Sequence, residues 1–250
     1  MNLVQSEAYL KTGKKKQTIV DLDTLACDFH RMMVGSLAIS PQQPLAKNDA
    51  PIKMAVLGLG GGLLTAYLVR NFKKARVTAV ELDPEVVKIA NSHFSFPHSD
   101  ARIEVIVQDA LIHLQEAAKK PEEEKYDVIF VDVSGSQNAA LLCPPPAFLT
   151  NDALTDIRNS LKEHGMLSLN LVTRDSDLGK KYKQAIGEHF PTLYTVLSAE
   201  DINEVIIGLK DAKTTPKAVV PQKLINTVRK DLGSYDDVVR SISNIRVVEF

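Results

Sequence analysis

The stretch VLGLGGG at residues 56–62 decides the fold, and VELD at residues 80–83 follows it as the end of a second apolar run. A buried strand that turns through glycines into a helix brings backbone N–H groups up to a ligand. An acid at the end of the next strand can bind ribose hydroxyls. The two stretches therefore predict a nucleoside cofactor site on a parallel α/β sheet.

The glycine spacing favours one kind of cofactor. A dinucleotide fingerprint G-x-G-x-x-G would place its third glycine at position 63, which is Leu63 here. Two further strands end in acids, at Asp109 and at Asp132. Such carboxylates suit a ligand that carries ribose hydroxyls, an adenine amine and a cationic centre. They suit a negatively charged pyrophosphate less well. The expected ligand is S-adenosylmethionine or its decarboxylated relative.

Composition narrows the function classes. The chain has 250 residues, with 30 Lys plus Arg against 31 Asp plus Glu, so no overall field attracts nucleic acid or an anionic membrane. Apolar runs are much shorter than the roughly 18 residues of a membrane span. Two distant cysteines, Cys27 and Cys143, are typical of reduced thiols in a soluble, cytoplasmic protein. We expect no direct nucleic-acid partner and no membrane contact, and a homodimer stays open.

The chain is expected to hold one large domain. Residues 1–18 are polar and lysine-rich, without an apolar period, and predict a flexible tail or linker. Residues 19–250 then form the cofactor-binding domain. The tail's position suggests that the domain follows another one in a longer parent protein.

The apolar period alternates between helical and extended spacing along the domain. Strands are expected at 53–58, 76–81, 102–107, 126–132, 165–171, 192–198 and 203–209. Helices are expected at 22–39, 62–71, 84–93, 110–119, 151–163, 177–189 and 221–232. The gap between the last two strands is too short for a helical crossover, so they should form an antiparallel hairpin. This predicts an α/β, Rossmann-like class I methyltransferase fold, with a seven-stranded, mostly parallel sheet and helices on both faces.

Cofactor contacts are assigned along the strand ends. Gly58, Gly60 and Gly62 should let the backbone pass beneath the methionine part, with Leu59 in the same turn. Glu81 should accept from both ribose hydroxyls, with Leu82 beside it. Asp109 and Ala110 should bind the adenine, although Asp109 also suits a helix N-cap.

Catalytic candidates follow from the next two strands. Asp132 should contact the transferable group and orient a substrate amine, with a plain strand-end cap as the alternative. Asn170 ends the fifth strand at the same edge, and its side-chain carbonyl could accept from that amine. His30, in the preceding helix, is either a further site residue or a satisfied half-buried histidine.

A substrate wall is expected after the fourth strand. Pro144, Pro145 and Pro146 predict a stiff extended segment that guides a peptide or merely connects two elements. Arg174 either shapes the rim or pairs with Asp175 in solvent.

The chain resembles the spermidine synthase-like class I methyltransferases, and within them the branch that methylates elongation factor 1-alpha. The matching stretches are 29–33, 56–62, 80–84, 143–148, 170–175 and 203–206. The resemblance implies S-adenosylmethionine as cofactor, S-adenosylhomocysteine as product and an N-methyltransferase acting on the N-terminal α-amine of that factor. It also implies a second, lysine-directed domain in the parent protein.

Two other functions stay open. Aminopropyltransferases of this family continue the fourth strand as Asp-Ser-Ser-Asp-Pro, whereas residues 132–136 read DVSGS and lack the second acid. A diamine would then lose a partner for one cationic end. A catalytically silent binding scaffold is the third reading, against which the intact carboxylates argue.

Overall fold

Parallel strands form the centre of the fold in this computed structural model, which describes residues 6–13, 16–40, 50–136, 138–211 and 235–248. Five of them lie side by side in the order β8-β6-β3-β4-β5. Their bounds are β3 (Ile52–Leu57), β4 (Ala75–Glu81), β5 (Ile103–Val107), β6 (Tyr126–Val131) and β8 (Leu161–Thr173). The predicted α/β architecture with parallel strands at its centre is confirmed.

An antiparallel hairpin closes the β8 edge, as predicted. It consists of β9 (Thr192–Leu197) and β10 (Asn203–Leu209), and β10 pairs with β8. The expected seven strands are too few, because the sheet has nine strands among the described residues. The two additions, β7 (Leu141–Cys143) and β11 (Arg246–Val247), span three and two residues, too short to produce an apolar period.

The sheet carries a separate core on each face. In β3, Met54 and Val56 point to one core while Ala55 and Leu57 point to the other, as the two-residue period of a strand requires. Near-continuous apolar strands are typical of a sheet that is covered on both sides. The expectation of helices on both faces is therefore confirmed.

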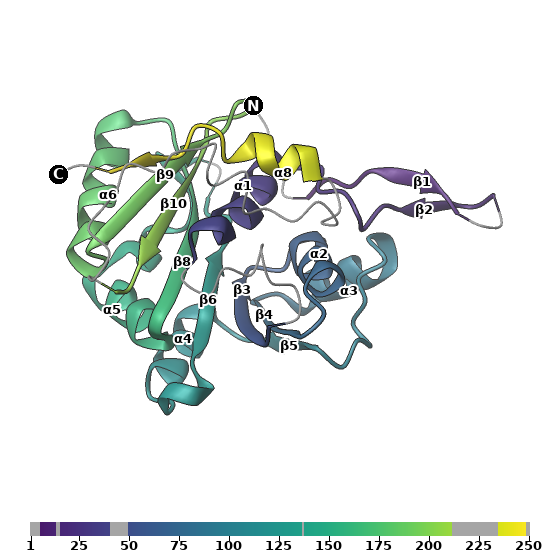
Figure 1. Cartoon of the computed structure of the whole chain (residues 1–250), viewed down its shortest axis with the longest axis horizontal. Helices are drawn as coiled ribbons and strands as arrows, with labels where there is room; N and C mark the ends of the chain where they lie inside the picture. The colour runs from purple at the N-terminus through teal and green to yellow at the C-terminus, as the bar shows by residue number, and fades with distance from the viewer. Residues whose placement is uncertain (1–5, 14–15, 41–49, 137, 212–234, 249–250) are drawn as a thin grey trace.

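The helices divide between these two faces (Figure 1). On one side lie α1 (Asp28–Ser36), α2 (Leu63–Asn71) and α8 (Tyr235–Ser241). On the other lie α4 (Ala110–Ala118), α5 (Asn151–Ser160) and α6 (Ser176–His189). A further helix, α3 (Pro84–His93), contacts β4 and carries Ala90 of a small third core. Among the described residues, no helix is long and apolar enough to cross a membrane.

Two helix predictions have wrong boundaries. The helix expected at 22–39 begins only at Asp28 and ends in the 3-10 turn η1 (Leu37–Ile39). The carbonyls of Leu25 and Ala26 accept from the Arg31 side chain instead of continuing a helix. The helix expected at 151–163 ends at Ser160, because Leu161 is already buried in β8 opposite Tyr126. The helix expected at 221–232 lies outside the described residues.

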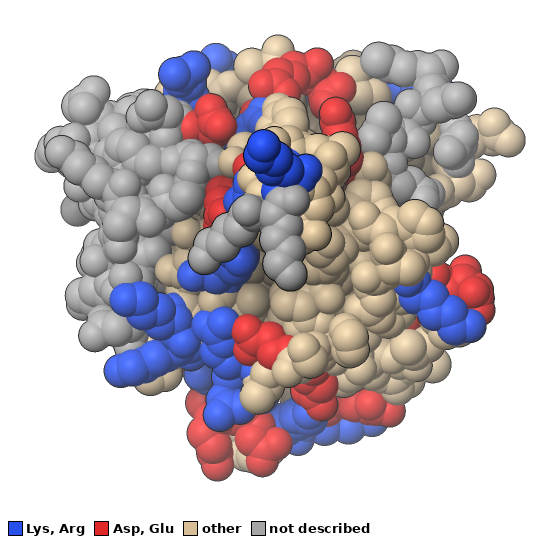
Figure 2. All heavy atoms as spheres, turned by 90° about the vertical axis from the view of Figure 1, so that its right-hand side faces the viewer, with Lys and Arg blue, Asp and Glu red and all other residues tan. Residues whose placement is uncertain are grey.

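The N-terminal segment also differs from its prediction. Leu10–Thr12 (β1) and Thr18–Val20 (β2) form a small antiparallel sheet that extends to one side of the molecule (Figure 1). Lys11 bonds Asp21 and Asp23, and Asp23 also accepts from Arg70 of α2. Part of the segment that was expected to be a tail thus forms a strand that is linked to α2 through Asp23. Acidic and basic side chains lie interspersed on this side of the molecule (Figure 2).

Candidate active site

A pocket of about 790 Å³ opens at the carboxyl ends of the parallel strands. Parallel strands bring their carboxyl ends to one edge of the sheet, so residues far apart in the sequence meet there. Most of the predicted site residues line it: Gly58, Leu59, Gly60, Glu81, Leu82, Asp109, Ala110, Asp132, Pro145, Asn170 and Arg174. Gly62, Pro144 and Pro146 are not among its lining residues.

The packing of the turn between β3 and α2 requires glycine at two positions, whether or not a ligand is bound. Gly58 has a φ of +89°, and a Cβ there would lie 2.2 Å from the carbonyl oxygen of Asp132. Gly62 has a φ of +73°, and its Cβ would meet the Phe96 ring at 2.3 Å. Gly58 thus lets the turn pass against the end of β6. Gly62 serves the packing against Phe96, and its expected place beside the cofactor stays a prediction.

Glu81 is tied to the turn that precedes it. Its Oε2 accepts from the Leu59 N–H at 2.9 Å, and its Oε1 accepts from the Asp83 N–H at 3.1 Å. A carboxylate has about four lone-pair sites, so two remain for a ligand. The interaction fixes the carboxylate at the pocket wall, where ribose hydroxyls were predicted to bind.

Asp109 has the helix-capping role that the sequence left open. Its Oδ1 accepts from the Leu111 N–H at 2.8 Å at the start of α4, while the residue also lines the pocket. The two roles coexist, because one carboxylate oxygen stays available.

The N-terminal segment contributes to the pocket in a way the sequence did not indicate. Ser6 and Glu7 line it, and the Ser6 Oγ accepts from the Gly61 N–H at 2.7 Å. One of the amides expected to face the cofactor is therefore already paired. No local signal marks Ser6, because it lies in a polar stretch without periodicity.

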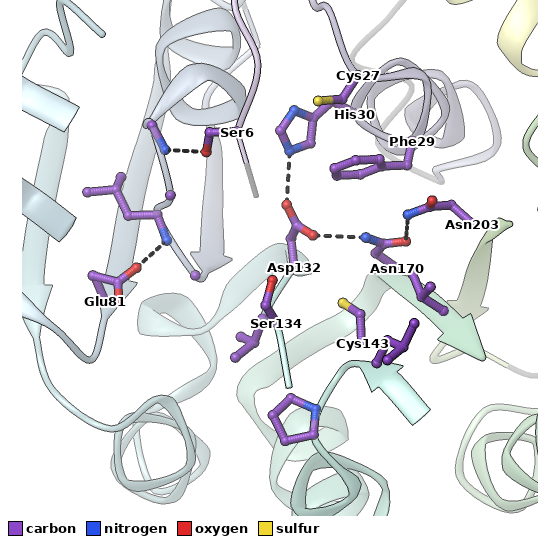
Figure 3. A pocket seen from close by; sticks show the side chains of 18 of the residues that line it. Ser6, Cys27, Phe29, His30, Glu81, Asp132, Ser134, Cys143, Asn170 and Asn203 are labelled. Carbon is purple, nitrogen blue, oxygen red and sulfur yellow. Dashed lines mark hydrogen bonds and ion pairs between the residues drawn. The ribbon is translucent and has the colours of Figure 1, made fainter. Parts of the chain in front are cut away.

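Asp132 lies at the centre of a hydrogen-bond network (Figure 3). Its Oδ2 is 2.9 Å from the His30 Nε2, and its Oδ1 accepts from the Asn170 Nδ2 at 3.0 Å. The Asn170 Oδ1 in turn accepts from the Asn203 Nδ2 at 2.9 Å. Residues of α1, β8 and β10 thus converge on the residue that follows β6.

The orientation of these amides follows from the carboxylate. An ionised carboxylate only accepts, so the amide nitrogen of Asn170 must face Asp132 and its oxygen must face Asn203. Asn170 therefore acts first as a donor to Asp132. Its carbonyl accepts from Asn203 and keeps a second lone pair, so the predicted contact of this carbonyl with a substrate amine stays a prediction.

Sequence reasoning did not assign Asn203, and it left His30 undecided. Asn203 begins β10, two residues before Val205, which pairs with Asn170 across the strands. Residues two apart in a strand share a face, so the register alone makes Asn203 a neighbour of Asn170. This relation is visible only once the antiparallel register is known.

The proline stretch is less extended than predicted. Pro144 is buried, Pro145 lines the pocket, and Pro146 begins the 3-10 turn η3 (Pro146–Leu149). Only one of the three prolines therefore forms part of the wall. Arg174 is exposed at the rim, and the Asp175 carboxylate caps α6 through the Asp177 and Leu178 N–H groups.

The pocket is rich in acids and lacks a reactive thiolate. Its lining includes one arginine, Arg174, against the acids Glu7, Asp28, Glu81, Asp83, Asp109, Asp132, Glu200 and Asp201. Burial raises the pKa of the Cys27 thiol to about 11, and burial also raises that of Cys143. Both lining thiols thus stay protonated at neutral pH. The environment favours cationic ligands, and neither cysteine competes as a nucleophile.

Comparison with known proteins gives the family. Residues 6–175 match the family model of the spermine/spermidine synthase domain. The chain therefore belongs to the spermine/spermidine synthase domain family, as the resemblance of its motifs predicted. The match starts inside the segment that was expected to be a tail.

Particular relatives refine this assignment. The "eEF1A lysine and N-terminal methyltransferase" of Xenopus laevis is 35% identical over 229 residues, covering 82% of this chain and 33% of that protein. The Danio rerio protein of the same name is 36% identical, covering 88% and 32%. The chain thus spans about a third of the length of these relatives.

The fold of the chain also matches a solved structure. Human Methyltransferase-like protein 13 in complex with SAH matches with a TM-score of 0.73 and 29% identity. The match covers 90% of this chain and 96% of that one.

Proposed function

We propose that this domain is an S-adenosylmethionine-dependent N-methyltransferase whose substrate is the N-terminal α-amine of elongation factor 1-alpha. The observation that carries the proposal is the position of the Asp132 carboxylate. It is hydrogen-bonded by His30 and Asn170 in an acid-lined pocket at the carboxyl ends of the strands. The names of the similar relatives support the reaction class and the substrate.

The pocket fits the cofactor in size and donor set. Small-molecule sites enclose about 300–1,000 Å³, and this pocket of about 790 Å³ lies within that range. Glu81 would hold the ribose, Asp109 and Ala110 the adenine, and the turn at Gly58–Gly60 the methionine part. S-adenosylmethionine, when bound there, supplies an electrophilic methyl group on a cationic sulfur.

Asp132 would receive the substrate amine. Two of its lone-pair sites are used by His30 and Asn170, and the others remain for an incoming N–H. A carboxylate favours the protonated amine, yet attack needs a free lone pair. An α-amine, with an ordinary pKa of about 8, loses its proton more readily than lysine at about 10.4. The site therefore suits an N-terminus, because it supplies orientation more than a strong base.

The decisive assay uses one peptide in two forms. The chain and S-adenosylmethionine are incubated with an elongation factor 1-alpha N-terminal peptide carrying a free α-amine, and with the same peptide acetylated at that amine. Mass spectrometry should find methyl additions on the free form and none on the acetylated form. Methylation of both forms would assign the activity to a lysine side chain, and methylation of neither would reject the substrate.

A third reaction separates the rival enzyme class. Decarboxylated S-adenosylmethionine with putrescine should give no spermidine, because residues 132–136 lack the second acid of the aminopropyltransferases. Spermidine formation would overturn the proposed reaction. We also propose a cytoplasmic location, which imaging of a tagged chain would test.

A further inference from the structure

His30 is a buried histidine with only one of its ring nitrogens paired among the described residues. The residue is 6% exposed and lies in the first turn of α1. Its Nε2 contacts Asp132 at 2.9 Å, while its Nδ1 is buried without a hydrogen-bond partner. A buried nitrogen without a hydrogen bond is unfavourable, so the position of His30 needs an explanation beyond stability.

We propose that His30 is a positioning residue for methyl transfer, which acts by fixing the Asp132 carboxylate from the α1 side. The inference rests on the proposed function, in which Asp132 receives the amine. It assigns a specific task to a residue that the sequence could equally place in the packing of α1.

The contacts assign the proton of the ring. Because the carboxylate is an acceptor, the hydrogen must lie on Nε2, which leaves a lone pair on Nδ1. A second proton on Nδ1 would find no acceptor among the described residues. His30 is thus placed to donate to Asp132 through its Nε2–H.

The two contacts on Asp132 come from opposite parts of the chain. His30 lies 102 residues before Asp132, and Asn170 lies 38 residues after it. Each holds a different carboxylate oxygen, so rotation of the group would break at least one bond. The plane of the carboxylate, and with it the direction of the free lone pairs, is therefore set by both partners.

His30 itself is held by the docking of its helix. Asp28 of the same turn accepts from the Ser198 Oγ at 2.6 Å and from the Ala199 N–H at 3.2 Å. Phe29 packs against the His30 ring edge-to-face with centroids 4.4 Å apart. These contacts anchor α1 to the connection between β9 and β10, which makes a rigid support for the donor.

The test compares two substitutions at position 30. His30→Leu keeps the volume and removes the donor, and kcat should fall by about 10- to 100-fold. His30→Gln keeps an amide N–H near the Nε2 position and should restore kcat to within about fivefold of the wild type. The affinity for S-adenosylhomocysteine, measured by calorimetry, should change by less than about twofold in both variants, because neither removes a predicted cofactor contact.

His113→Leu is the matched control. His113 is also a buried histidine with one side-chain partner, since its Nε2 lies 2.8 Å from the Tyr126 Oη, but it does not line the pocket. Its substitution should lower the melting temperature and leave kcat near the wild-type value. A loss of kcat in His113→Leu equal to that in His30→Leu would overturn the proposal.

A double-mutant cycle tests whether His30 acts through Asp132. In the Asp132→Ala background, His30→Leu should cause less than about a twofold further loss in kcat, since alanine has no side-chain acceptor for the His30 Nε2–H. Independent losses, unchanged kcat in His30→Leu, or an equal loss in His30→Gln would each overturn the positioning role. An inactive wild-type chain would instead show that the proposed function itself fails.

Discussion

At the scale of single residues, Glu81 combines two tasks. It accepts from the Leu59 and Asp83 N–H groups, which fixes its carboxylate at the end of β4. We predict that Glu81→Ala weakens binding of S-adenosylhomocysteine by at least about 100-fold, because two charge-assisted hydrogen bonds to the ribose are lost. Titration calorimetry measures the affinity, and circular dichroism checks that the variant is folded.

Glu85→Gln provides the comparison for this variant. Glu85 lies nearby in the first turn of α3, where its exposed carboxylate pairs with Lys88. Its substitution should leave the affinity unchanged within error. Equal affinities of the wild type and Glu81→Ala would remove Glu81 from the cofactor site.

At the scale of elements, the turn between β3 and α2 holds the site together. The Gly58 N–H donates to the Val80 carbonyl, and the Asp132 N–H donates to the Leu57 carbonyl. We predict that Gly58→Ala lowers the free energy of unfolding by at least about 3 kcal/mol, because its Cβ would overlap the Asp132 backbone at a positive φ. Denaturant unfolding measures the change.

Gly179→Ala is the control for a glycine without such constraints. It lies in α6, and its Cβ would meet only a Thr173 methyl group at 3.3 Å. The helix gains propensity while the contact tightens, so the net change should stay below about 1 kcal/mol. If Gly58→Ala and Gly179→Ala lowered the free energy of unfolding equally, the close approach of Gly58 to the Asp132 backbone would not explain the loss of stability.

At the scale of the whole molecule, Arg31 connects α1, the helix that carries His30, to the β9–β10 hairpin. It donates to the Leu25 and Ala26 carbonyls, and it pairs with Asp28 and Glu200. We predict that Arg31→Met lowers the free energy of unfolding by about 3 kcal/mol, because Asp28 is buried and two carbonyls lose their donor. Chemical denaturation followed by circular dichroism gives the value.

Lys88→Met removes a cation from an exposed pair with Glu85 and serves as the reference. Solvent already screens that pair, so its loss should cost less than about 1 kcal/mol. A small effect of Arg31→Met would mean that packing of α1 against the sheet, rather than this ion-pair network, keeps His30 in place.

Much of the architecture was predictable from local pattern. The apolar runs around 56–62 and 80–83 gave the strands, because burial on both faces of a parallel sheet leaves a continuous apolar signal. The short gap before Asn203 required a hairpin. Errors fell on β7 and β11, which are too short for periodicity, and on the start of α1, where buried residues of the preceding loop imitate a helical period.

The sequence by itself determined that three carboxylates gather at the pocket, since Glu81 ends a strand of one parallel sheet and Asp109 and Asp132 follow two others. Only the tertiary structure decided their partners. The contacts of Asp132 with His30 and of Gly61 with Ser6 span 102 and 55 residues. Local spacing controls where a strand ends, whereas a hydrogen bond over such a distance depends on strand register and on how α1 docks, for which no local pattern exists.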